Sequence, residues 1–114
     1  MPKGESLGEF EHIVMLAVLR LDAVAYGMRI RHEIERRTAR DVTIGAVYST
    51  LERLELKALI SSSAGEPTPE RGGRAKRFFR VTPEGVQALN RVRRELDRMF
   101  EGMPAPLPEG GQGK

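Results

Sequence analysis

The fold is decided by the stretch GGRAKRFFRVTPEG, which spans residues 72–85. From Arg74 to Val81 the stretch follows the two-residue period of a β-strand, which would place Phe78 and Phe79 on opposite sides. Thr82-Pro83-Glu84 follows at once and combines an N-cap residue, a proline at the first helical position and an acidic first turn. The stretch therefore predicts a strand that leads directly into the last helix of the chain.

A partner for this strand is expected just upstream. Leu59–Ser63 is typical of a short strand, and residues 64–73 are rich in the glycine and proline of a loop. Two strands around such a loop form a hairpin. The predicted wing spans about residues 59–81.

Three helices are predicted before the hairpin. They cover Leu7–Leu21, where Ser6 and Glu9 would form a capping box, then about Tyr26–Arg37, then a helix capped by Thr43 that runs to about residue 58. The first helix is apolar nearly all round, and a helix without a polar face is normally buried on more than one side. We expect a second subunit to cover part of it.

The last helix carries an apolar seam at spacings of three and four residues, the pattern by which two helices pair along their length. The seam consists of Leu89, Val92, Leu96, Met99 and Met103. The predicted domains are thus an N-terminal tail at 1–6, a unit of three helices and the hairpin at 7–82, a dimerisation helix at 83–102 and a disordered tail at 103–114.

Composition narrows the classes of function. The chain has 114 residues, which suits one compact domain, and it has no cysteine, so disulfides and thiolate chemistry are excluded. Its two histidines, His12 and His32, are interpreted as lone surface or interface residues, so no enzyme, cofactor or metal is expected. The longest apolar run, Ile13–Leu19, is far shorter than the roughly 20 residues that span a bilayer. These features predict a soluble cytoplasmic protein without a membrane partner.

Three helices, a hairpin and a final helix form the element order of a winged helix-turn-helix, an α+β and mostly helical fold. In such folds the third helix enters the major groove of double-stranded DNA, and the hairpin loop reaches phosphates or the minor groove. Between Arg53 and Arg80 there are seven basic and three acidic residues, whereas the whole chain has a net charge of only +3. The residues that predict DNA contacts are small hydroxyl and basic ones: Thr43, Ser49, Thr50, Arg53, Lys57, Arg71, Arg74, Lys76, Arg77 and Arg80.

Other interpretations remain open at this point. The cations can be a solvated face, and Arg53 can pair with Glu52 or Glu55 within its own helix. Lys76 can lie beside Phe78 as a packed stem. The alternative function is a winged-helix module that binds another protein without sequence-specific DNA binding.

A more specific resemblance is carried by GAVYSTLERLE at residues 45–55, Leu59-Ile60 and GRAKRFFRVTPEG at 73–85. LGEFE at 7–11 and Tyr26-Gly27 match as well. Over about residues 7–101 the chain resembles the PadR family of prokaryotic transcriptional regulators, in its short form with a single C-terminal helix. The family implies a homodimeric winged helix whose last helix pairs with the first at the dimer interface. Most members are repressors, and some release DNA when a phenolic or multidrug-like ligand binds.

The resemblance also implies roles for single residues. It places Tyr48 and Ser49 at phosphates, although Tyr48 can instead be a half-buried ring hydrogen-bonded to the second helix. It places Gly73 in the basic wing and gives Gly45 a geometric role in packing or backbone contact. The chain has no tryptophan, which in some members stacks on flat drugs at the dimer centre. The dimer interface, or a pocket for a small hydrophobic or aromatic effector, would then use Phe10, Val14, Met15, Leu89, Val92, Leu96, Met99, Phe100 and Met103.

Overall fold

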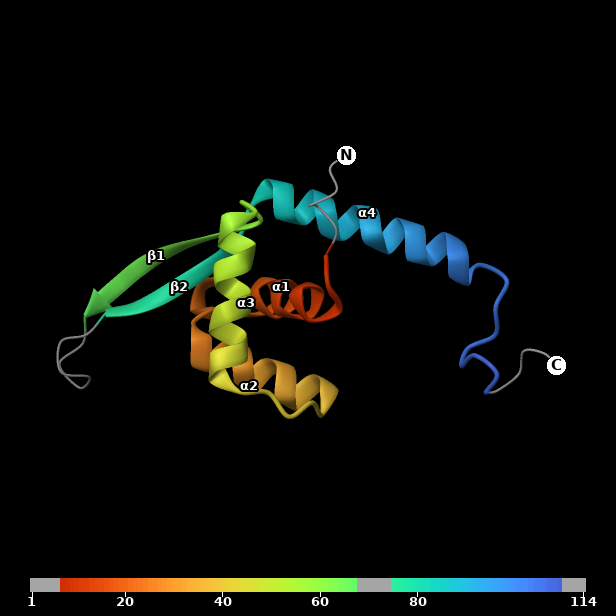
Figure 1. The fold of residues 1–114 in the computed structure, drawn as a ribbon, viewed down its shortest axis with the longest axis horizontal. Helices are drawn as coiled ribbons and strands as arrows, with labels where there is room; N and C mark the ends of the chain where they lie inside the picture. Colours follow the sequence, from red (N-terminus) through yellow and green to blue (C-terminus); the bar gives the residue numbers. More distant parts are fainter. Residues whose placement is uncertain (1–6, 68–74, 110–114) are drawn as a thin grey trace.

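The computed structural model describes residues 7–67 and 75–109, and it orders them as predicted: three helices, a hairpin and a fourth helix (Figure 1). Residues 1–6, 68–74 and 110–114 are outside the description. The elements are α1 (Glu9–Leu21), the 3-10 turn η2 (Asp22–Val24), α2 (Gly27–Thr38), α3 (Ile44–Leu56), β1 (Ile60–Pro67), β2 (Ala75–Val81) and α4 (Pro83–Phe100). No helix in the described ranges is long and apolar enough to cross a membrane.

The core lies between α1, α2 and α3, and the start of the hairpin closes it. Each helix contributes a stripe of buried aliphatic side chains, because apolar residues at helical spacing face the same side. The largest fully buried side chains of these helices are Met15, Ile30, Ile34, Leu51 and Leu54. Phe79 and Val81 of β2 add to the same core, as the two-residue period of the strand requires.

The start of α1 differs from the prediction. The helix begins at Glu9, with Gly8 as the extended N-cap residue, and the backbone N–H of Gly8 donates to Glu11 Oε1 at 3.0 Å. The predicted pairing of Ser6 with Glu9 is wrong for Glu9, whose carboxylate instead pairs with Arg40 at 3.1 Å, and Ser6 is outside the described residues. With the N-cap at Gly8, the acid in the third helical position is Glu11 rather than Glu9.

The hairpin is antiparallel and joined to the helices at its base. Ile60 pairs with Val81 and Ser63 with Phe78, and the register becomes irregular between Ala64 and Pro67. The strand β1 ends at Pro67, whereas the predicted strand ended at Ser63. The N–H of Phe79 donates to the carbonyl of Ala25 at 2.8 Å. The wing is thereby fixed to the connection between α1 and α2.

The predicted start of α4 is confirmed. Thr82 Oγ1 accepts from the N–H of Gly85 at 3.0 Å and donates to the carbonyl of Ala58 at 2.9 Å, so one hydroxyl group caps α4 and ties it to the end of α3. The helix ends at Phe100, and beyond its first two turns it extends away from the other helices (Figure 1). Residues 103–109 form neither helix nor strand.

Candidate nucleic-acid interface

The outward face of α3 is the surface that the fold offers to a groove. Thr43 caps the helix as predicted, since its Oγ1 accepts from the N–H of Ala46 at 3.0 Å. Val47, Leu51 and Leu54 face the core. The row opposite them is exposed and consists of Gly45, Ser49, Glu52 and Leu56. Its first half is therefore small and its second half larger, which favours close approach at the N-terminal end of α3.

Ser49 and Tyr48 border this first half. Ser49 is exposed, and its hydroxyl group donates to the carbonyl of Ala46 at 3.3 Å. The Tyr48 ring lies against α2, because a methyl group at Gly27 would collide with its ring and hydroxyl oxygen. Among the described residues the Tyr48 hydroxyl has no hydrogen-bond partner, so the predicted bond to α2 is absent and the group is open to an external acceptor.

Gly45 has no packing role within the protomer. A Cβ added there would meet nothing within 4 Å, so the prediction that a side chain would obstruct packing is wrong. What remains of the predicted role is close approach of a ligand to the backbone.

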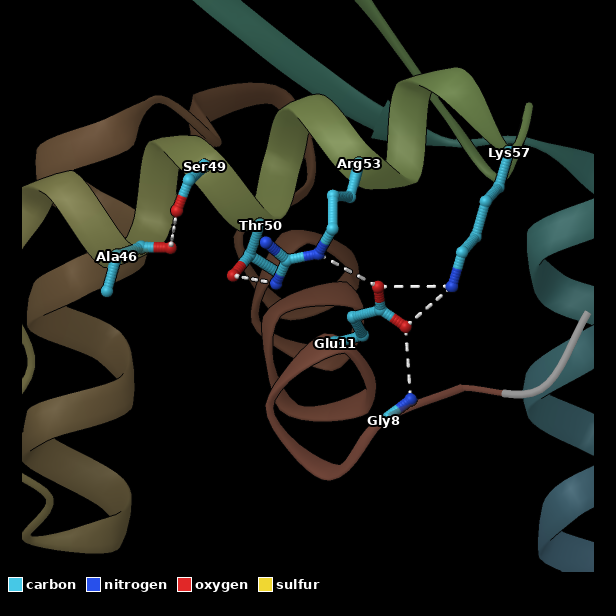
Figure 2. A network of polar contacts seen from close by, with 7 residues as sticks. All are labelled: Gly8, Glu11, Ala46, Ser49, Thr50, Arg53 and Lys57. Carbon is cyan, nitrogen blue, oxygen red and sulfur yellow. Dashed lines mark hydrogen bonds and ion pairs between the residues drawn. The ribbon is translucent and has the colours of Figure 1, made fainter. Parts of the chain in front are cut away.

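The buried carboxylate of Glu11 binds Arg53 and Lys57, which form the basic flank at the C-terminal end of α3 (Figure 2). Glu11 Oε2 accepts from Arg53 Nε at 3.4 Å, and Lys57 Nζ donates to Oε1 at 2.9 Å and to Oε2 at 3.1 Å. The Glu11 side chain is 8% exposed, whereas that of Arg53 is 54% exposed. Both cations on this flank are therefore positioned by α1.

The same network shows that the prediction for Thr50 is wrong. The sequence pattern predicted an exposed hydroxyl group that contacts DNA, but Thr50 is 2% exposed. Its Oγ1 instead accepts from Arg53 Nη2 at 3.2 Å (Figure 2). Thr50 lies on the side of α3 that packs toward α1, so it supports Arg53 from within the protein.

Sequence reasoning missed Glu11 and gave Arg53 the wrong partners. Arg53 pairs with Glu11, which is 42 residues away in the chain, rather than with Glu52 or Glu55. Glu55 accepts from the hydroxyl group of Ser62 at 2.6 Å. The sequence feature that could have indicated a buried role for Glu11 is its place as an acid within a helix that is apolar nearly all round.

The Glu11 network lowers the pKa of its carboxyl group. Burial raises that pKa, but hydrogen bonds from Lys57 and from the Gly8 N–H, together with the charge of Lys57 and the Arg53 hydrogen bond, outweigh burial. The net result is a pKa below the ordinary value of a glutamate. A lowered folded-state pKa stabilises the fold above the unfolded-state pKa of about 4.3, and this stabilisation is lost as the pH falls through the folded-state value.

We therefore expect Glu11→Gln to flatten the acid side of the stability profile. Wild-type protein should lose more unfolding free energy than the variant between about pH 5 and pH 3, because only the wild type must protonate this carboxylate. Urea denaturation at several pH values measures the difference. Parallel stability profiles for the two proteins would contradict the assignment.

The wing carries the second group of predicted contacts. Lys76 Nζ lies 4.2 Å from the centroid of the Tyr26 ring, and this ring meets Phe78 edge-on with centroids 5.7 Å apart. Lys76 is thus oriented by a cation–π contact rather than being a loose surface cation. Arg77 and Arg80 are exposed, and the predicted contacts Arg71, Gly73 and Arg74 are outside the described residues.

The predicted dimer-interface set divides into two groups. The predictions for Val14 and Met15 are wrong, because both are 0% exposed in the protomer core, and Leu89 is mostly buried. The physical reason is that these side chains fill the space beneath α4 and inside the three-helix unit. Phe10 and Val92 are partly buried, and the outer seam is exposed: Leu96, Met99, Phe100 and Met103.

An apolar groove runs between α1 and the exposed part of α4. It encloses about 470 Å³, and its apolar lining includes Leu16, Leu19, Val86, Leu96 and Phe100. Leu16 and Leu19 were absent from the predicted interface set, although the all-round apolar pattern of the first helix pointed to an outer face. The groove joins the exposed apolar side chains of α1 to those of α4, and its polar lining is His12, Asn90, Arg93 and Asp97.

Comparison with known proteins bears on this architecture. The sequence model of the transcriptional regulator PadR-like family matches residues 15–91, which include all of α2, α3 and the hairpin. The chain belongs to the PadR-like family of transcriptional regulators. The family consists of DNA-binding regulators rather than enzymes.

Individual PadR-like and winged-helix proteins agree with the family assignment. The transcriptional regulator Rv3488 of Mycobacterium tuberculosis is 36% identical over 78 residues, which cover 68% of each chain. A transcriptional regulator from Clostridium thermocellum has the same fold with a TM-score of 0.64 and 24% identity, covering 80% of this chain and 85% of the other. F93 from STIV, a winged-helix DNA-binding protein, aligns with a TM-score of 0.57 and 17% identity. The alignment covers 82% of this chain and 95% of the other. The predicted winged helix-turn-helix is thus confirmed.

Proposed function

We propose that this PadR-like protein is a homodimeric repressor that binds an inverted-repeat operator, with α3 of each subunit in the major groove. The observation that carries the proposal is the outward face of α3. Small exposed residues at its N-terminal half, Gly45 and Ser49, let the helix approach base edges, as recognition helices do. Tyr48 and Arg53 flank this half with groups suited to phosphate or base contacts.

The dimer is supported by the apolar surface of α1 and α4. Leu96, Met99 and Phe100 are exposed along one side of a helix that extends away from the core. A contiguous apolar surface of this kind commonly marks a protein interface. Paired α4 helices would hold two copies of α3 at a set distance, matched to half-sites about one helical turn apart.

Selection of bound duplexes from a random pool tests this function. We expect a palindromic consensus whose half-site centres are about 10 base pairs apart. A pool without any enriched sequence would contradict sequence-specific binding and favour the alternative of a protein-interaction module. Gel shifts with the selected duplex at moderate salt would check the result.

Arg74 in the wing is proposed to neutralise a phosphate. Arg74→Ala should weaken binding to all duplexes alike and reduce the slope of log affinity against log salt by about one unit. A salt titration with the selected duplex and an unrelated duplex measures both effects. Unchanged affinity and slope would contradict the role proposed for the wing.

Release by a small hydrophobic or aromatic effector is the remaining part of the proposal. The α1–α4 groove, at about 470 Å³, has the size of a ligand pocket, and a partner subunit would cover its open side. A screen for compounds that raise the melting temperature and release the operator tests it. Compounds that do only the first would speak against regulation through this groove.

A further inference from the structure

We propose that Glu11 is a positioning residue for DNA recognition. From α1 it fixes the Arg53 guanidinium on α3 so that one particular nitrogen of that group, Nη1, stays open to a base or phosphate. This inference rests on the proposed function, because it concerns how the same surface reads DNA.

The guanidinium group of Arg53 has three nitrogens that donate hydrogen bonds. Nε carries one N–H group, and Nη1 and Nη2 carry two each. In the protein two of these nitrogens are engaged from opposite sides, since Nε donates to Glu11 Oε2 at 3.4 Å and Nη2 donates to Thr50 Oγ1 at 3.2 Å (Figure 2). Nη1 has no hydrogen-bond partner among the described residues, so its two N–H groups are open.

Both groups that hold Nε and Nη2 are themselves fixed in place. Thr50 is 2% exposed, and Glu11 is anchored by the Gly8 N–H at 3.0 Å and by Lys57 at 2.9 Å. Arg53 therefore gives up much of its rotamer freedom in the free protein, and less remains to be lost on binding. The open N–H groups of Nη1 can donate to an acceptor on a base edge, such as guanine O6 or N7, or to a phosphate oxygen.

The carboxylate also limits the charge of this flank. Glu11 neutralises one of the two cations Arg53 and Lys57, so the flank attracts phosphates less than two unpaired cations would. Positioning of Arg53 by Glu11 increases discrimination between sequences, whereas neutralisation of charge by Glu11 lowers affinity for any duplex. Loss of the Glu11 charge should weaken discrimination between sequences while strengthening binding to any duplex.

Fluorescence anisotropy with Glu11→Gln tests this combination. The probes are a labelled duplex carrying the selected consensus and the same duplex with both half-sites scrambled, each titrated at several KCl concentrations. We expect the ratio of the two affinities to fall about tenfold, because a well-placed contact to a base is lost. Affinity for the scrambled duplex should rise and its salt dependence should steepen. A wild-type ratio in the folded variant would overturn the inference.

Glu9→Gln is the matched control. Glu9 is on the same helix, and its carboxylate is 81% exposed and paired with Arg40, away from Arg53. The same loss of one charge should leave the affinity ratio unchanged. A tenfold fall in both variants would mean that charge alone explains the effect, and it would overturn the positioning role.

Two further variants keep the outcome interpretable. If Glu11→Gln does not fold, Thr50→Val removes the Nη2 acceptor while keeping Glu11 and the buried volume, and it should also lower the ratio. In an Arg53→Lys background neither change should lower it further. If the wild-type protein shows no preference for the consensus, both the proposed function and this inference are contradicted. If the wild-type preference persists in both folded variants, only this inference is contradicted.

Discussion

Leu96→Glu is expected to convert the proposed dimer into a monomer and to lower affinity for the proposed operator by about 100-fold or more. Leu96 is 50% exposed on the apolar side of α4, where it lines the groove with Leu16 and Phe100. A carboxylate at this position would place a charge among the apolar side chains of a closed dimer, and burial of a charge there is strongly unfavourable. The monomer would then bind one half-site at a time.

Light scattering coupled to size-exclusion chromatography measures the mass, and anisotropy measures the affinity. Leu107→Glu provides the same change in chemistry at a similarly exposed residue, 45%, beyond the end of α4. It should leave both mass and affinity near wild type. A Leu96→Glu protein that remains dimeric with full affinity would exclude α4 as the dimerisation helix. A monomer with unchanged affinity would show that operator binding does not need two subunits.

Gly85→Ala is expected to lower the free energy of unfolding by about 3 kcal/mol, the upper part of the usual range for overpacking a core. A Cβ at Gly85 would collide with the carbonyl oxygen of Leu59 and crowd the side chains of Val81 and Met15. The Leu59 carbonyl cannot easily move, because it accepts from the Thr82 N–H at 3.0 Å. The change would therefore push the start of α4 away from the three-helix unit.

Gly45→Ala is the control for this prediction. The same added methyl group meets open space there, and alanine favours helix over glycine, so stability should be unchanged or rise by up to about 1 kcal/mol. Urea denaturation followed by circular dichroism compares the two variants with wild type. Equal stability of the two variants would contradict the close packing assigned to Gly85.

The order and type of the elements followed from local patterns. The Thr43 and Thr82 caps, the alternation through Phe79 and Val81, and the helical stripes of the core could all be predicted, because each depends on residues within one or two turns. The predicted start of α1 was wrong, because Gly8 rather than Ser6 is the N-cap residue and both residue types are acceptable there. The motifs that indicate the PadR-like family are also short contiguous segments, so they could be recognised from the sequence.

The sequence by itself determined a winged helix whose third helix carries Arg53 and Lys57 near its end and whose last helix carries an apolar seam. Only the tertiary structure decided which side chains are left for a ligand. Met15 and Leu96 both fit apolar helical patterns, yet Met15 is enclosed by the core and Leu96 is exposed. Arg53 meets Glu11 across 42 residues of chain, a distance at which periodicity carries no information about contact. The core and the recognition surface are settled by packing between helices, which no single helix specifies.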